Sequence, residues 1–154
     1  MAHLHISRHV AAPAEVVYDL VSDLPRMGEW SPETERVLWR GDATGPALGA
    51  RFIGWNRRGA VRWFTHGEVV EAERGRRFAF EVTVGPVRVA RWEYVMVPDA
   101  DGMGCTVAEE WTERRPRFAR LTDAAMGPRQ TINATGMERT LDALARAAES
   151  VRAP

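Results

Sequence analysis

The pattern of hydrophobic and polar positions predicts mostly β-structure between two helical regions. Leu4 to Val10 reads as a first strand, and residues 33–113 form short runs in which polar and apolar positions alternate. Tight turns containing glycine or proline separate most of these runs, so neighbouring strands should pair antiparallel. The six strands expected after the first are Thr34–Trp39, Ala50–Asn56, Val61–Glu73, Arg77–Val84, Val87–Val97 and Cys105–Glu113.

Helical patterns lie on either side of these six strands. A first helix is expected to open within residues 11–15, where Pro13 suits the first turn, and a second short helix should run from about residue 22 to Trp30. After Pro116 the apolar residues recur every three or four positions, and Gly127-Pro128 should mark the entry to a long helix. Its predicted apolar stripe comprises Ile132, Met137, Leu141, Leu144, Ala148 and Val151. The sheet is the only large partner for that stripe.

These elements predict one α+β domain over residues 1–154. A curved, seven-stranded antiparallel sheet should wrap around the long C-terminal helix, with two short helices between strands 1 and 2. An apolar cavity of ligand size is expected between the sheet and this helix.

Composition narrows the chemistry. The chain has 154 residues, of which 45% are hydrophobic and 27% charged, and its 21 acidic and 21 basic residues cancel. This balance argues against a nucleic-acid or membrane-surface role driven by net charge. Every basic residue is arginine, so Schiff-base catalysis by lysine is excluded. No cofactor is implied, and either a monomer or a homodimer is compatible with the sequence.

Cysteine content and hydropathy suggest a cytoplasmic protein. The single cysteine, Cys105, can form neither a disulfide within the chain nor a cysteine-based metal cluster. The N-terminus lacks the apolar segment of a signal peptide, and no apolar run approaches the length needed for membrane insertion.

Strand alternation assigns the aromatic side chains to one face of the sheet, which we expect to be concave and to lie beneath the long helix. The opposite face carries the charged positions of the same strands, which suit solvent. The predicted ligand-binding residues, with two side chains from the long helix at the end, are Phe52, Asn56, Trp63, Thr65, Phe78, Phe80, Trp92, Tyr94, Met96, Glu109, Trp111, Asn133 and Met137. Val84 is grouped with Phe78 and Phe80 by the same alternation.

Four polar residues stand out on this apolar face, namely Asn56, Thr65, Glu109 and Asn133. A buried carboxylate is costly, so Glu109 should be paired with an arginine, protonated, or exposed to a wet cavity. The structural ion pair is the favoured explanation, and a catalytic or ligand-binding role for Glu109 is the alternative.

Other polar clusters are interpreted as solvent-exposed. His3, His5 and His9 share one face of the first strand and are expected to face solvent rather than bind a metal. His66 should also face outward, and the run of arginines at 114–117 should form a solvated loop.

The order of elements resembles the helix-grip fold of the SRPBCC superfamily, which includes START domains, birch-pollen-allergen-like proteins and bacterial polyketide cyclase/dehydrase-like proteins. The closest likeness is to actinobacterial proteins of the last group. The segments that carry the resemblance are Ala12-Pro13-Ala14-Glu15-Val16-Val17-Tyr18, Asp23–Pro32, Gly49-Ala50-Arg51-Phe52, Thr106–Trp111 and Met137–Leu141.

Two functions of different classes follow from the resemblance and the expected cavity. The favoured function is binding of a hydrophobic small molecule, such as a lipid, a polyketide or another aromatic metabolite. The alternative is an aromatase/cyclase-type enzyme that acts on a polyketide by general acid–base chemistry, with Glu109 as candidate catalytic residue. No set of residues matches a catalytic motif position by position. A chaperone-like or ribosome-associated role is a weaker third option.

Overall fold

The computed structural model describes residues 2–152 and contains one sheet flanked by helices. The first part of the chain forms β1 (His3–Val10), α1 (Ala14–Val21) and the 3-10 helix η1 (Leu24–Glu29). The strands β2 (Thr34–Arg40), β3 (Arg51–Arg58), β4 (Val61–Glu73), β5 (Arg77–Val84), β6 (Val87–Pro98) and β7 (Cys105–Glu113) follow. The 3-10 helix η2 (Arg117–Thr122), the one-turn helix α2 (Asp123–Met126) and the long helix α3 (Arg129–Arg152) complete these residues.

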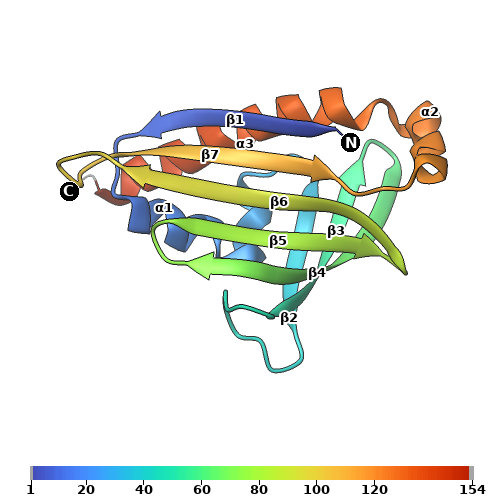
Figure 1. The fold of residues 1–154 in the computed structure, drawn as a ribbon, viewed down its shortest axis with the longest axis horizontal. Helices are drawn as coiled ribbons and strands as arrows, with labels where there is room; N and C mark the ends of the chain where they lie inside the picture. Colours follow the sequence, from blue (N-terminus) through green and yellow to red (C-terminus); the bar gives the residue numbers. More distant parts are fainter. Residues whose placement is uncertain (1, 153–154) are drawn as a thin grey trace.

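Within these residues, the seven strands form one antiparallel sheet in the order β1-β7-β6-β5-β4-β3-β2. The predicted α+β architecture is confirmed, including the short helices between β1 and β2 and the long C-terminal helix. Figure 1 shows α3 along one side of the sheet, behind β1 and β7, while β2 and β3 turn away from the other strands. We call the face of the sheet toward α1 and α3 the concave face.

The start of α3 lies close to the predicted position because Gly127 breaks the preceding helix. Gly127 has φ 86°, a backbone conformation that other residues rarely adopt, and Pro128 follows it directly. The sequence did not predict η2 and α2, which have no buried residue among their ten.

One face of α3 is buried against β1, β7 and α1. Met137, Leu141 and Leu144 are at most 3% exposed, as the helical spacing predicts. Val151 was wrongly included in this stripe, since it is 63% exposed. Val151 lies in the last turn of α3, after the buried Leu144 and Ala148, so the buried stripe ends before it.

A second error concerns Val84, which is 44% exposed instead of belonging to the aromatic face. The register of β5 and β6 shifts between Val82 and Thr83, so strict alternation fails at this hairpin. On the aromatic face itself, Gly67 shows how tightly the side chains are packed. A Cβ on Gly67 would lie 2.0 Å from the Phe52 ring, which therefore requires glycine beneath it.

Candidate functional site

The strand register arranges the concave face in rows of side chains. In the first row, Glu109 of β7 lies opposite Tyr94 of β6, which lies opposite Phe78 of β5. In the next row, Trp111, Trp92 and Phe80 are neighbours in the same way, and the two tryptophan rings lie 6.4 Å apart. Aromatic side chains on three adjacent strands therefore form a continuous apolar surface next to a carboxyl group.

All of the predicted ligand-binding residues are at least partly shielded from solvent. Asn56, Trp63 and Trp92 are half-buried. The buried members are Phe52, Thr65, Phe78, Phe80, Tyr94, Met96, Glu109, Trp111, Asn133 and Met137. The structure thus assembles these residues on the face where alternation places them.

Small side chains follow beside the aromatic rows. Ala90, Val82 and Gly67 occupy the third row across β6, β5 and β4. On α3, Gly136 is half-buried and lies one turn from the buried Asn133 and Thr140. A Cβ added to Gly136 would meet no atom of the described residues within 4 Å. There is consequently open space beside this turn of α3.

Glu109 is the most unusual group on the concave face. Its side chain is 2% exposed, and the Tyr94 hydroxyl donates a hydrogen bond of 2.8 Å to Oε1. The other oxygen, Oε2, is buried and has no hydrogen-bond partner among the described residues. Burial raises the pKa of Glu109 to about 8, although the hydrogen bond from Tyr94 opposes this shift. The carboxyl group is therefore mainly protonated near neutral pH and can donate a hydrogen bond from Oε2.

The predicted ion pair of Glu109 with an arginine is wrong. None of the ion pairs formed by residues 2–152 includes Glu109. Its partner is instead Tyr94, whose pKa is raised well above its ordinary value by burial and by the nearby Glu109 carboxyl. Among the explanations offered by the sequence, protonation agrees with the burial and the raised pKa of Glu109.

A polar cluster lies where α3 begins. The Arg129 guanidinium donates to both Glu33 oxygens, at 3.0 Å and 2.8 Å, and to the Asn133 Oδ1 at 3.0 Å. Its Cζ also lies 5.8 Å from the centre of the Trp63 ring. This cluster connects the first turn of α3 to the segment before β2 and to β4. Sequence reasoning identified Asn133 and Trp63 but missed Arg129 and Glu33, because nothing in the sequence links residues 96 positions apart.

A second buried ionic cluster anchors the segment between β7 and α3. Arg115 is 9% exposed, donates to Glu113 through Nε, and donates to Asp123 Oδ1 at 2.8 Å. The expected solvated loop is therefore wrong for Arg115, although Arg114 and Arg117 are exposed. Glu113 continues the inward positions of β7 after Trp111, and this alternation was the available signal for it. Because Arg115 pairs with both acids and Arg120 also lies 3.9 Å from Glu113, the cluster holds η2 and α2 in place.

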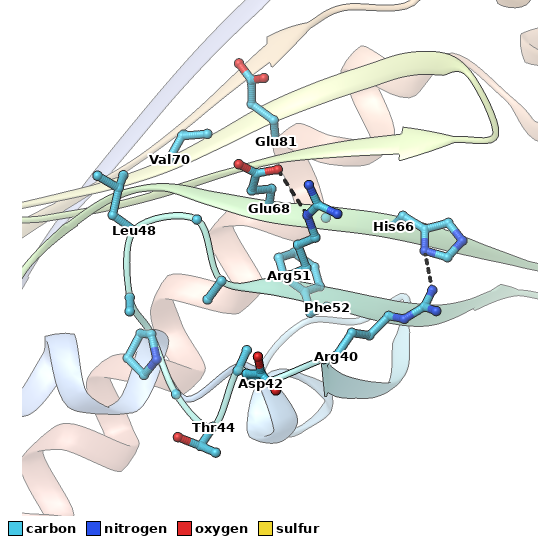
Figure 2. Close-up of a pocket in the computed structure, with 18 of the residues that line it drawn as sticks. Arg40, Asp42, Thr44, Leu48, Arg51, Phe52, His66, Glu68, Val70 and Glu81 are labelled. Atoms are coloured by element: carbon cyan, nitrogen blue, oxygen red, sulfur yellow. Dashed lines mark hydrogen bonds and ion pairs between the residues drawn. The ribbon is translucent and has the colours of Figure 1, made fainter.

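The outer face of the sheet carries an open groove of different character. Figure 2 shows the loop at residues 41–49 arching beside the outward side chains of β3, β4 and β5. The groove has a volume of about 1290 Å³, and its walls include an Arg51–Glu68 ion pair at 3.6 Å. His66 lies here and contacts Arg40 at 3.0 Å, so it faces outward as predicted. Charged walls suit an apolar ligand poorly, and the concave face remains the candidate site.

The histidines of β1 lie on the outer face of the sheet. His5 and His3 contact Glu110 and Thr112 of β7, and His9 lies 2.7 Å from Asp99. Over residues 2–152, no group of three or more metal-binding side chains was found. Within the same residues, no helix combines the length and the apolar character required to traverse a lipid bilayer.

Comparison with known proteins agrees with this architecture. Residues 1–149 match the family described as "Polyketide cyclase / dehydrase and lipid transport". The chain belongs to this polyketide cyclase/dehydrase family. Among the curated proteins, no match to this chain was found.

Solved structures similar to this family member include the polyketide-cyclase-like protein Cgl2372 from Corynebacterium glutamicum. It shares 36% identity over 96% of this chain and 91% of its own, with a TM-score of 0.64. A protein from Thermobifida fusca is 25% identical over 94% of this chain and 91% of its own, also with a TM-score of 0.64. The di-domain aromatase/cyclase StfQ of the steffimycin biosynthetic pathway is 16% identical, with a TM-score of 0.70. That match covers 97% of this chain and 45% of StfQ, and it shows a shared fold.

Proposed function

We propose that residues 1–154 form a single domain that binds a hydrophobic small molecule between the concave face of the sheet and the first half of α3. The ligand would be a lipid, a polyketide or another aromatic metabolite. The observation that carries this proposal is the buried Glu109 carboxyl, whose Oε2 has no partner among residues 2–152 and which lies beside the aromatic rows of the concave face. A polar atom so placed favours a ligand or water that completes its hydrogen bonds.

Two further features support ligand binding. Trp92 and Trp63 are only half-buried although they lie on the face that α3 borders, and Gly136 leaves space beside that helix. The family description names both polyketide cyclase/dehydrase activity and lipid transport, and both involve largely apolar molecules.

Tryptophan fluorescence tests this proposal. Palmitate or the flat polyphenol quercetin should quench the emission saturably, and Trp92→Leu should reduce the amplitude of the quench. Trp55→Leu is the matched control, because Trp55 lies on the outer face of β3 beneath Arg36, and it should leave the ligand-dependent change intact. Native mass spectrometry of the purified protein would identify a co-purified ligand directly. The absence of any response to both compounds, together with no bound mass, would refute the proposal.

Glu109 also favours a second candidate function, that of an aromatase/cyclase-type enzyme. A protonated carboxyl beside a hydroxyl can donate a proton to a carbonyl oxygen of a bound polyketide and later accept one from carbon. Glu109→Gln keeps the size of the side chain and removes this proton transfer. If the protein is an enzyme, this variant should bind the substrate but lose turnover. If it is a carrier, the variant should retain its function.

A further inference from the structure

Three loops gather at the end of the molecule where α3 begins. In an antiparallel sheet of this order, the β3–β4 turn, the β5–β6 turn and the end of β7 all lie at the same end. Two contacts confirm their proximity, since the Arg114 amide donates to the Val89 carbonyl at 2.9 Å and Arg129 covers Trp63. Figure 1 shows α2 and the start of α3 at this end, near the turn from β3 to β4. We call residues 57–62, 84–88 and 114–121 the rim.

Large apolar side chains are exposed on all three loops of the rim. Val61 and Val84 are each 44% exposed at the two hairpins. Phe118 is 69% exposed and Leu121 is 79% exposed on the 3-10 helix η2. Exposing such side chains to water is unfavourable, and several of them at one end of a molecule indicate a contact surface.

The charge of the rim has one sign. Every charged residue within its three segments is an arginine: Arg57, Arg58, Arg62, Arg88, Arg114, Arg115, Arg117 and Arg120. With Arg129 beside them there are nine arginines, whereas the acids that contact them are four, namely Glu33, Glu35, Glu113 and Asp123. Nine minus four leaves an excess of five positive charges. Because the whole chain has no net charge, the rest of the molecule carries five negative charges in excess.

We propose that the rim docks this protein onto the surface of an anionic lipid bilayer. Arginines near such a surface are attracted to its headgroups, while apolar side chains between them enter the boundary with the acyl chains. The charge separation between the rim and the rest of the molecule orients the rim toward a negative surface before contact. Balanced net charge had argued against a membrane-surface role, but that argument averages over a molecule whose charges are separated.

The shape of the rim favours a bilayer over an acidic protein. Its apolar side chains stand on three separate loops, and each loop also carries exposed arginine. Loop tips of this kind can enter a fluid surface together, whereas a folded partner would need a matching recess for each. The proposal concerns this surface alone and does not require that a ligand occupy the concave face.

Vesicle sedimentation tests the proposal on the full-length protein. At low salt, the protein should sediment with vesicles of phosphatidylcholine that contain 30% phosphatidylglycerol. It should not sediment with vesicles of phosphatidylcholine alone, and added salt should weaken its binding to the anionic vesicles. Each arginine contributes about fivefold to such binding, so Arg114→Glu with Arg117→Glu should weaken it by at least about 25-fold. Phe118→Ser with Leu121→Ser should weaken it by roughly tenfold.

The control variant is Arg139→Glu with Arg146→Glu. It makes the same change of charge at two exposed positions of α3 away from the rim, and it should leave sedimentation nearly unchanged. Failure to sediment with anionic vesicles, or an equal loss in the control, would overturn the proposal. Undiminished vesicle binding by the Phe118/Leu121 variant would also overturn the proposal. Binding would then depend on charge alone, and any polyanion, including an acidic protein, could replace the bilayer. Circular dichroism checks that each variant is folded.

Discussion

At the scale of single residues, Glu109 shows how a strand pattern locates a group without determining its state. Alternation places Glu109 among apolar neighbours, and its burial to 2% exposure agrees with that placement. The partner could not be predicted, because it depends on the exact register of β6 against β7. The register puts Tyr94 opposite Glu109, so the buried carboxyl receives a hydroxyl instead of a guanidinium.

The raised pKa of Glu109 makes stability depend on pH. Between about pH 4.5 and pH 8 the unfolded chain loses the Glu109 proton, while the folded protein keeps it. The unfolded state therefore binds fewer protons, and the free energy of unfolding should fall as the pH rises through this window. The free energy of unfolding should level off above about pH 8, after Glu109 has lowered it by up to roughly 5 kcal/mol.

Glu109→Gln should remove this slope and make the protein more stable than the wild type at pH 8.5. Urea unfolding at pH 5 and pH 8.5 measures both effects. Glu81→Gln, on the outward side of β5, should retain the wild-type slope. Equal slopes in the wild type and in Glu109→Gln would show that Glu109 ionises as readily in the folded protein as in the unfolded chain.

At the scale of elements, the sequence predicted the strands well because both of its signals are local. Turn residues separate the strands, and the period of two defines their faces. The errors at Val84 and Val151 lie at ends of elements, where a register shift or the final helical turn breaks the period. The segment η2–α2 was missed because it buries no side chain, so it carries no hydrophobic pattern.

The buried stripe of α3 should contribute strongly to stability. Leu141 is 3% exposed and belongs to the core that α3 shares with the sheet, so Leu141→Ala should cost about 2–5 kcal/mol through lost burial and the cavity left behind. The exposed Arg139→Ala should change stability by no more than about 0.5 kcal/mol. Thermal or urea unfolding measures the loss of stability in each variant. Equal losses would show that the face of α3 assigned to the sheet is the wrong one.

Substitutions at Gly136 can distinguish an effect on ligand binding from an effect on protein stability. Gly136→Ala should stabilise α3 by about 0.5–1 kcal/mol, because glycine is a poor helix former and its added Cβ meets nothing. Gly136→Leu should also fold but should fill the space that we assign to the ligand. We expect quercetin or palmitate binding to survive the alanine variant and to weaken in the leucine variant. Fluorescence titration measures this, and unchanged binding in both would move the ligand away from α3.

At the scale of the whole molecule, a long-range ion pair connects the first turn of α3 to the segment before β2, and the sequence does not reveal it. In the first half of α3, beside the small residues of the concave face, Met137 is buried among Asn133, Gly136 and Thr140, whereas the second half buries Leu141 and Leu144. Besides the packing of Met137, the first half of α3 is therefore held by polar contacts such as Arg129 with Glu33. Sequence patterns predict the scaffold of the candidate site, while its polar boundary depends on contacts between distant segments.

The Arg129–Glu33 pair should accordingly contribute more to stability than an ion pair on the surface. Its side chains are 16% and 21% exposed, it makes two short hydrogen bonds, and Asn133 fixes the guanidinium from the other side. A double-mutant cycle with Arg129→Gln and Glu33→Gln, measured by urea unfolding, should give a coupling energy of about 1–3 kcal/mol. Arg26 and Glu29 form a similar two-bond pair that is 44% and 53% exposed, and their cycle should give less than about 1 kcal/mol. If the two cycles gave the same value, the pair would not hold the first turn of α3. That turn would then be free to move away from β4, which would leave Trp63 without its cover and the concave face open at this end.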